Sequence, residues 1–382
     1  MVTTAENAGF VQNASGRLMS LDVFRGATIA AMLLVNDPGD EKNIFWPLKH
    51  AEWNGWTPTD LIFPFFLFIV GVSMAFSIPG RLRRHPSRIA ELKHVFRRGA
   101  ILFAIGLLLN GMIVKFDVSV WRVYGVLQRI AICYVVCAIL TLWCRPKLRI
   151  TVVVVGLLGY WALMRYVPVP GFGVPTRDVP LLDPNRNLAA WIDRKLLAGH
   201  LYEGTRDPEG LLSTIPAIAT TLLGLLTGKW LRSGYSSRAK AIGVALPGVL
   251  LIALGQLWNL WLPINKNLWT SSYAIFTAGA ALIALAICYA VLDVARWRGP
   301  WTTPWLVFGM NAIAAYIFGS LLAITLYVLP IGDDSAQEFI YQTIFEPLAS
   351  PVVASVLYAA GFVAVCWIPM WALYRKKIFL KV

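Results

Sequence analysis

Residues 46–71, WPLKHAEWNGWTPTDLIFPFFLFIVG, join a polar connection to an apolar run, and this stretch sets the fold class. The run extends to about residue 78 and has no charged residue after Asp60. Because roughly 20 apolar residues in a helix cross the hydrocarbon core of a bilayer, the run predicts a membrane span. His50 lies in the polar connection, so a histidine and a carboxylate stand at the boundary between water and membrane. This pairing indicates a reaction site.

The composition of the whole chain is that of a membrane protein. Of the 382 residues, 58% are hydrophobic and only 14% are charged, whereas soluble domains carry roughly 25% charged residues. The apolar runs predict an all-α, polytopic fold with about ten transmembrane helices and lipid around them. The expected spans are about 18–36, 58–79, 95–115, 124–143, 149–167, 211–231, 241–262, 269–292, 304–329 and 351–374.

The charged residues between the spans predict the orientation of the chain. More than half of the 34 Lys and Arg lie in the short connections after every second span and in the C-terminal tail. The positive-inside rule therefore places both termini in the cytoplasm and the His50 connection on the periplasmic side. The same distribution explains the net charge of +14 without a nucleic-acid partner.

Outside the spans, two segments differ from the short connections. Residues 1–16 are polar and predict a disordered cytoplasmic tail, which leaves 17–382 as a single transmembrane domain. Residues 168–210 form a long loop, rich in Pro, Gly and Asp, on the same side as His50. Long loops between spans are usually functional or disordered, so a lid or an acceptor-binding role is one interpretation. Within the loop, NLAAWIDRKLL predicts a short helix.

The five cysteines lie in or beside apolar spans and show neither a disulfide framework nor paired metal-binding spacing. We interpret them as small buried residues, and we expect no metal site. They are Cys133, Cys137, Cys144, Cys288 and Cys366.

Two interpretations of Asp60 follow from the sequence TPTDLIF. Thr57, Pro58 and Asp60 have the order of a helix start, with the carboxylate in the acidic position of a capping box. Alternatively, Asp60 accepts a hydrogen bond from the imidazole of His50 and fixes its tautomer. The Asn54-Gly55 pair predicts a turn that brings the two side chains together.

Four arginines are candidates for holding an anionic cofactor. Arg25 lies three residues after Asp22 in the first span, where a local ion pair is the simpler explanation. Arg97 and Arg98 open the third span, where they either set the topology or contact phosphate. Arg129 lies inside the fourth span and must be paired or line a cavity.

Polar and aromatic side chains on the His50 side are candidates for binding an acceptor. Trp53 and Asn54 follow shortly after His50, and Asn265, Lys266 and Trp269 lie between the seventh and eighth spans. Amides, a cation and an indole ring fit a sugar-binding edge, and a tight polar turn explains the second group equally well.

Six stretches in order carry a resemblance to one family: RLMSLDVFRG, LLVN, HAEWNGWTPTDLIFPFFLFIVGVSMA, RVYGVLQRIAICY, DPEGLLSTIPAIATTLLG and INKNLWTSSYAIFTAG. Together they resemble the heparan-α-glucosaminide N-acetyltransferase family, which comprises the lysosomal transmembrane enzyme and bacterial homologues such as the NagX-type proteins. The resemblance runs from about Arg17 to Asn311.

This resemblance implies transfer of an acetyl group from cytoplasmic acetyl-CoA to an amino sugar across a bacterial inner membrane. The family's catalytic histidine falls on His50, its asparagine on Asn36 and its aspartate on Asp60. It also implies a homodimer. His50 then serves either as a nucleophile that carries the acetyl group or as a general base.

Three other functions remain open at this point. The first is a proton-coupled sugar or glycan transporter that uses His50, Asp60 and Arg129 as a relay. The second is an O-acyltransferase acting on a hydroxyl of an envelope glycan. The third is a structural membrane subunit without chemistry.

Overall fold

The computed structural model describes residues 18–380, so the predicted tail 1–16 lies outside the described residues. The chain is almost wholly helical, and its strands form one short antiparallel hairpin, β1 (Pro330–Ile331) with β2 (Asp334–Ser335). The helices are α1 (Met19–Asn36), α2 (Ile62–Arg84), α3 (Arg88–Ile113), α4 (Val126–Trp143), α5 (Pro146–Tyr166), α6 (Leu188–Leu197), α7 (Thr214–Leu231), α8 (Ser237–Trp258), α9 (Ser271–Tyr289), α10 (Thr303–Met310), α11 (Ala312–Val328), α12 (Ala336–Ile340) and α13 (Pro351–Arg375).

The helix count confirms a polytopic all-α membrane protein. Between residues 18 and 380, nine helices are long and apolar enough to cross a membrane, and the bent pair α10–α11 brings the number to ten. Local signals place the helix starts, because Ser87 and Ser236 accept N-cap hydrogen bonds and Pro351 occupies the first turn of α13. The short helix expected in the 168–210 loop is α6, capped by Asn187.

The expected ninth span consists of two helices, α10 and α11, rather than one continuous helix. The chain bends by 77° between α10 and α11 at Asn311. The buried Asn311 amide donates to the carbonyl of Ile378 at 3.2 Å, and its oxygen accepts the N–H of Leu380 at 3.0 Å. Asn311 therefore forms hydrogen bonds with the segment after the last helix. These bonds satisfy polar groups at the break between α10 and α11, and the apolar sequence around Asn311 does not predict that break.

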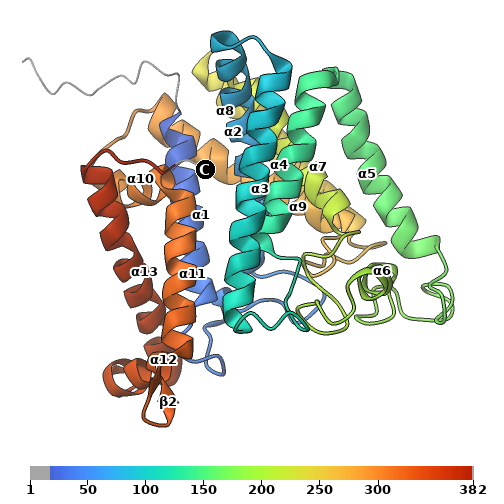
Figure 1. Ribbon diagram of the computed structural model, residues 1–382. Coiled ribbons are helices and arrows are strands. Elements are labelled where there is room, and N and C mark those ends of the chain that lie inside the picture. The colour runs from blue at the N-terminus through green and yellow to red at the C-terminus, as the bar shows by residue number, and fades with distance from the viewer. Residues whose placement is uncertain (1–17, 381–382) are drawn as a thin grey trace, which may run out of the picture.

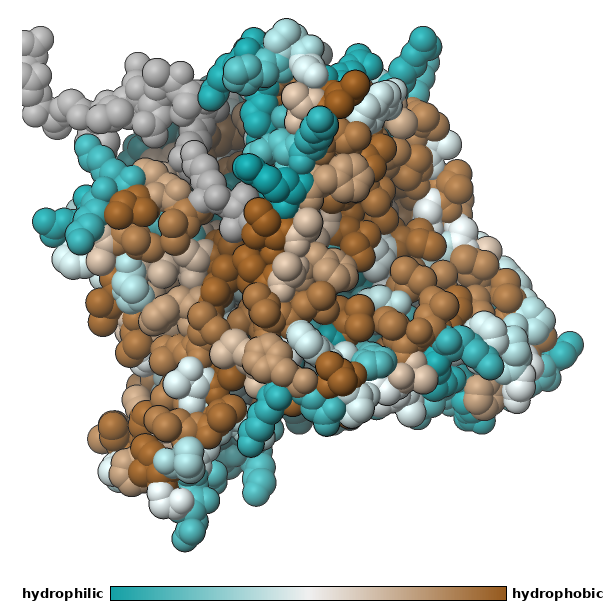
Figure 2. Space-filling model, in the orientation of Figure 1, coloured by the Kyte–Doolittle hydropathy of each residue, from teal (hydrophilic) through white to brown (hydrophobic). Residues whose placement is uncertain are grey.

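The connections alternate between two ends of the bundle (Figure 1). The α2–α3, α4–α5 and α7–α8 connections lie at one end, which we call the basic end. The α1–α2 connection with His50, the 168–210 loop with α6, and the hairpin lie at the opposite end, which we call the His50 end. Figure 2 shows hydrophobic side chains gathered between these ends and hydrophilic ones toward them, as a membrane protein requires.

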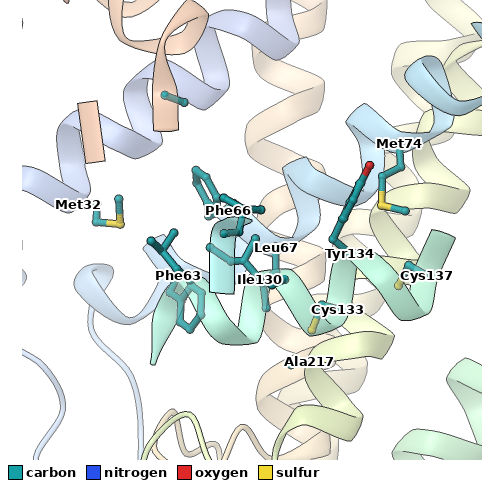
Figure 3. Packing of buried hydrophobic residues seen from close by; sticks show 14 of the residues in the cluster. Met32, Phe63, Phe66, Leu67, Met74, Ile130, Cys133, Tyr134, Cys137 and Ala217 are labelled. Carbon is teal, nitrogen blue, oxygen red and sulfur yellow. The ribbon is translucent and has the colours of Figure 1, made fainter. Parts of the chain in front are cut away.

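The core brings α1, α2, α4 and α7 together, and side chains of α2 and α4 fill it (Figure 3). Helices α2 and α7 approach closely because glycines face the opposing backbone. A Cβ at Gly71 would lie 1.9 Å from the carbonyl oxygen of Thr221, and one at Gly224 would lie 2.1 Å from that of Phe68. Small residues at such contacts are typical of membrane helices. This packing fixes the start of α2, and with it Asp60.

Candidate active site

The His50 connection folds back onto the loop that precedes α9. Gly55, with a φ of 98°, donates its N–H to the carbonyl of Ile264 at 2.7 Å. Glycine adopts this left-handed conformation without steric cost. The predicted Asn-Gly turn thus brings the loops before α2 and before α9 side by side.

Asp60 performs both of the functions that the sequence left open. One carboxylate oxygen, Oδ2, accepts the backbone N–H groups of Thr57 (2.9 Å) and Ala51 (3.0 Å), which completes the capping box. The other, Oδ1, lies 2.7 Å from Nδ1 of His50. Asp60 is only 1% exposed, whereas the His50 side chain is 47% exposed. A buried carboxylate therefore orients an accessible imidazole, with Nδ1–H donating and Nε2 left as the acceptor.

Lys266 completes the cluster from the loop before α9. Its Nζ lies 3.0 Å from Nε2 of His50 and 3.9 Å from Oδ1 of Asp60. Nζ also lies 3.1 Å from Nδ1, so the amine sits beside both ring nitrogens of His50. Burial lowers the pKa of Lys266, although the Asp60 carboxylate opposes this shift. The arrangement is a compact cluster of a carboxylate, an imidazole and an amine.

Asn265 and Trp269 hold this loop in shape. The fully buried Asn265 amide donates to the Trp53 carbonyl (2.9 Å) and to Oδ1 of Asn54 (3.2 Å), and its oxygen accepts the Leu268 N–H (2.9 Å). Trp269 is 1% exposed and packs edge-on against Phe63. These contacts match the tight polar turn rather than a sugar-binding edge.

Trp53 links the site to the long 168–210 loop. Its indole N–H donates to the carbonyl of Leu182 at 2.8 Å, and the guanidinium of Arg206 lies 5.0 Å from its ring. In the same loop, Asp207 accepts two hydrogen bonds from Arg122, which joins the loop to the α3–α4 connection. The loop is thus an ordered cover beside the site, and Asn54 stays exposed next to it.

The four candidate arginines lie at opposite ends of the bundle. Arg25 does form the local ion pair with Asp22 (3.0 Å), and it also donates to Ser73 Oγ of α2 (2.8 Å). Arg97 is exposed toward the basic end, and Arg98 lies 5.0 Å from the ring of Tyr134 on α4.

Arg129 belongs instead to the His50 end. Its guanidinium is 1% exposed, contacts the Ser213 hydroxyl, donates to the Gly210 carbonyl at 3.0 Å and lies 5.2 Å from the ring of Trp269. It joins the start of α4 to the start of α7 and supports the loop that carries Lys266. Because Arg129 lies at the His50 end, its position does not favour a contact with phosphate groups at the basic end.

Asn36 and Tyr273 complete the inventory of the site. Asn36 ends α1 and is exposed, with no side-chain hydrogen bond to residues 18–380. Sequence reasoning missed Tyr273, whose buried hydroxyl donates to the backbone carbonyl of Asp60 at 2.5 Å. It lies in the same quoted stretch as Lys266, but only the fold shows that α9 reaches the start of α2.

Comparison with known proteins identifies the family. A sequence profile described as "Heparan-alpha-glucosaminide N-acetyltransferase, catalytic" matches residues 17–258. The heparan-alpha-glucosaminide N-acetyltransferase of Homo sapiens is 31% identical over 424 residues, covering 96% of this chain and 60% of that protein. The Mus musculus enzyme is 31% identical over 428 residues, covering 97% and 61%. The chain thus spans about three fifths of the length of these relatives. It contains the six ordered stretches and the family's catalytic region, and it belongs to the heparan-α-glucosaminide N-acetyltransferase family.

Proposed function

We propose that this protein is a transmembrane acetyltransferase. It transfers an acetyl group from acetyl-CoA, which enters at the cytoplasmic basic end, to the amine of a glucosamine-type sugar at the periplasmic His50 end. The protein is then a multi-pass component of a bacterial inner membrane. The observation that supports this most directly is the contact between His50 and the buried Asp60 in a member of this family.

The geometry suits the proton transfer that amide formation requires. A sugar ammonium must lose a proton before its nitrogen attacks the thioester carbonyl, and an imidazole is the side chain best matched to that step. Asp60 keeps the Nδ1 proton in place, so Nε2 faces the reactants as the base. The new C–N bond forms, the C–S bond breaks, and the thiol of CoA leaves with a proton. Direct transfer needs no acyl-imidazole beside water, and we favour it over an acetyl-His50 intermediate.

In this proposal, the two substrates bind at opposite ends of the bundle. Arg97 and Arg98 near the basic end are the proposed contacts for the phosphates of CoA, with Arg25 close to the same region. Asn36 at the His50 end is the proposed polar group for the developing oxyanion. Trp53 and Asn54 are the proposed acceptor contacts.

The test uses detergent-purified protein, radiolabelled acetyl-CoA and glucosamine. Wild type should label the sugar, and His50→Ala should lose that activity. His200→Ala is the matched control, because His200 lies on the same side with Nδ1 2.9 Å from the carbonyl of Trp121. N-acetylglucosamine in place of glucosamine distinguishes N- from O-acetylation. If acetyl-CoA is neither bound nor consumed with any amino sugar, the proposal fails and a transporter becomes the better explanation.

A further inference from the structure

Lys266 places a primary amine where the proposed reaction needs the amine of the acceptor. Its Nζ is 3.0 Å from Nε2 and 3.1 Å from Nδ1 of His50, within the distance at which an amine can pass a proton to the imidazole. We propose that Lys266 is a self-acetylation site: without an acceptor, the active site transfers the acetyl group of acetyl-CoA to Nζ of Lys266. This inference rests on the proposed function.

The position of the Lys266 side chain is fixed by its loop. The backbone carbonyl of Lys266 accepts the N–H of Trp269 at 3.0 Å, and neighbouring Asn265 is buried and bonded on both sides. The side chain is 22% exposed, so a reagent can reach the amine from the site. A nucleophile held beside its base reacts faster than a free amine in solution, because the fixed position gives it a high effective concentration.

The chemistry is the proposed reaction with a different nucleophile. Nζ loses a proton to Nε2 of His50 and attacks the thioester carbonyl, forming a C–N bond. The C–S bond breaks, the nitrogen gives its second proton to water, and the CoA thiolate takes the proton that His50 releases. Only the neutral amine attacks, and burial of Lys266 favours that form because it lowers the pKa of its ammonium.

Acetylation of Lys266 would change the site in a defined way. The product is an uncharged amide, so the cation beside His50 and Asp60 is lost and the acetyl group fills the space next to Nε2. Acetyl-CoA should therefore inactivate the protein when no acceptor is present, and an acceptor amine should protect it by occupying the same space.

Peptide mass spectrometry of the full chain tests this inference. Purified protein is incubated with acetyl-CoA alone, with acetyl-CoA and glucosamine, or with neither. We expect an acetyl group on Lys266 in the first sample, at least tenfold less in the second, and none in the third or in His50→Ala. Lys195, which is exposed on the same side, reports the uncatalysed background in every sample.

A second variant separates modification from general damage. Lys266→Arg keeps a cation but cannot form the amide, so its glucosamine acetylation rate should be the same before and after incubation with acetyl-CoA alone. Wild type should lose most of its rate in that incubation. If wild type acetylates glucosamine yet Lys266 stays unmodified, or if Lys266 and Lys195 react equally without His50, this inference is wrong and the proposed function stands. If neither sugar nor lysine is acetylated, both fail.

Discussion

At the level of single residues, the site depends on how Asp60 uses its two oxygens. One satisfies backbone N–H groups at the start of the second span, and the other orients His50. The helix cap and the hydrogen bond to the imidazole are thus made by one buried carboxylate. This explains why the helix start and the imidazole keep a fixed relation to each other.

Asp60→Asn should separate these two functions. An amide has one acceptor oxygen, and if this oxygen keeps the cap, the NH₂ group faces Nδ1 of His50 and forces the proton to Nε2. We expect the rate of acetyl transfer to fall about a hundredfold or more, with a stability loss of about 1 kcal/mol or less. Steady-state rates and thermal unfolding in detergent measure the two effects.

Thr57→Val is the matched control for the cap. It removes a hydroxyl that donates to the Lys49 carbonyl at 2.7 Å and lies 3.2 Å from Oδ2 of Asp60, and it leaves the contact between Oδ1 and His50 in place. It should cost stability of the same order and keep most of the activity. Equal losses of activity in both variants would contradict the orienting role of Asp60.

Asp37, just after α1, should make stability depend on pH. Burial raises the pKa of its carboxyl to about 7 from the ordinary value of 3.8. The folded protein therefore favours the protonated form, and the resulting stability is complete below pH 3.8 and is lost as pH rises through about 7. Asp37→Asn should remove this dependence and raise the melting temperature above pH 7.

Asp40 provides the control of opposite sign. Hydrogen bonds from Asn43 and from the backbone of Lys42 lower the pKa of its carboxyl, so its contribution is present near neutral pH and is lost on acidification. Asp40→Asn should lower the melting temperature at pH 7 and not at acidic pH. If the melting temperature of Asp37→Asn varies with pH as that of wild type does, Asp37 is hydrated and the prediction for Asp37 is wrong.

At the level of elements, the contact between α2 and α7 supports the site. Asp60 lies two residues before α2, and Ser213, the contact of Arg129, directly precedes α7. Two helices whose backbones nearly touch therefore set the distance between the two halves of the His50 end. Neither helix can shift without moving one of these groups.

Gly224→Ala should disturb this contact. The added Cβ would meet the carbonyl of Phe68 at 2.1 Å, so the helices must separate. We expect a loss of about 1–3 kcal/mol, as for other overpacked cores, together with reduced acetyl transfer. Gly159→Ala in α5 is the control, because its Cβ meets no atom of residues 18–380 within 4 Å. Thermal unfolding of the two variants compares them, and equal stability would contradict the close packing.

At the level of the whole molecule, the proposed orientation assigns the His50 end to the periplasm. Single cysteines report this orientation when labelled with a maleimide that does not cross membranes. Lys195→Cys should be labelled in spheroplasts, and Lys376→Cys only after the membrane is permeabilised. Both positions are exposed at opposite ends of the bundle. Both variants are made in a background with Cys144→Ser and Cys288→Ser, because these two cysteines are half-buried whereas Cys133, Cys137 and Cys366 are buried, and this background alone is the control. The reverse labelling pattern would invert the proposed path of acetyl-CoA.

The homodimer stays a prediction.

Much of this fold could be predicted from the chain itself. Nine spans, the helix in the 168–210 loop and the cap at Asp60 follow from local composition, because apolar length and helix-start residues act within a few residues of each other. His50 was found for the same reason, since a polar connection beside an acid-headed span is visible in one stretch.

The remaining features arise from contacts between distant segments. Lys266 reaches His50 across more than 200 residues, Tyr273 supports Asp60 from another helix, and Asn311 breaks a span because the C-terminal segment accepts and donates its hydrogen bonds. The sequence shows that Arg129 is costly in a membrane, but its partners come from the loop before α7 and from the loop before α9. Local propensity contains no information about such partners. They depend on how the helices pack, and the packing follows from the glycines that allow α2 and α7 to approach.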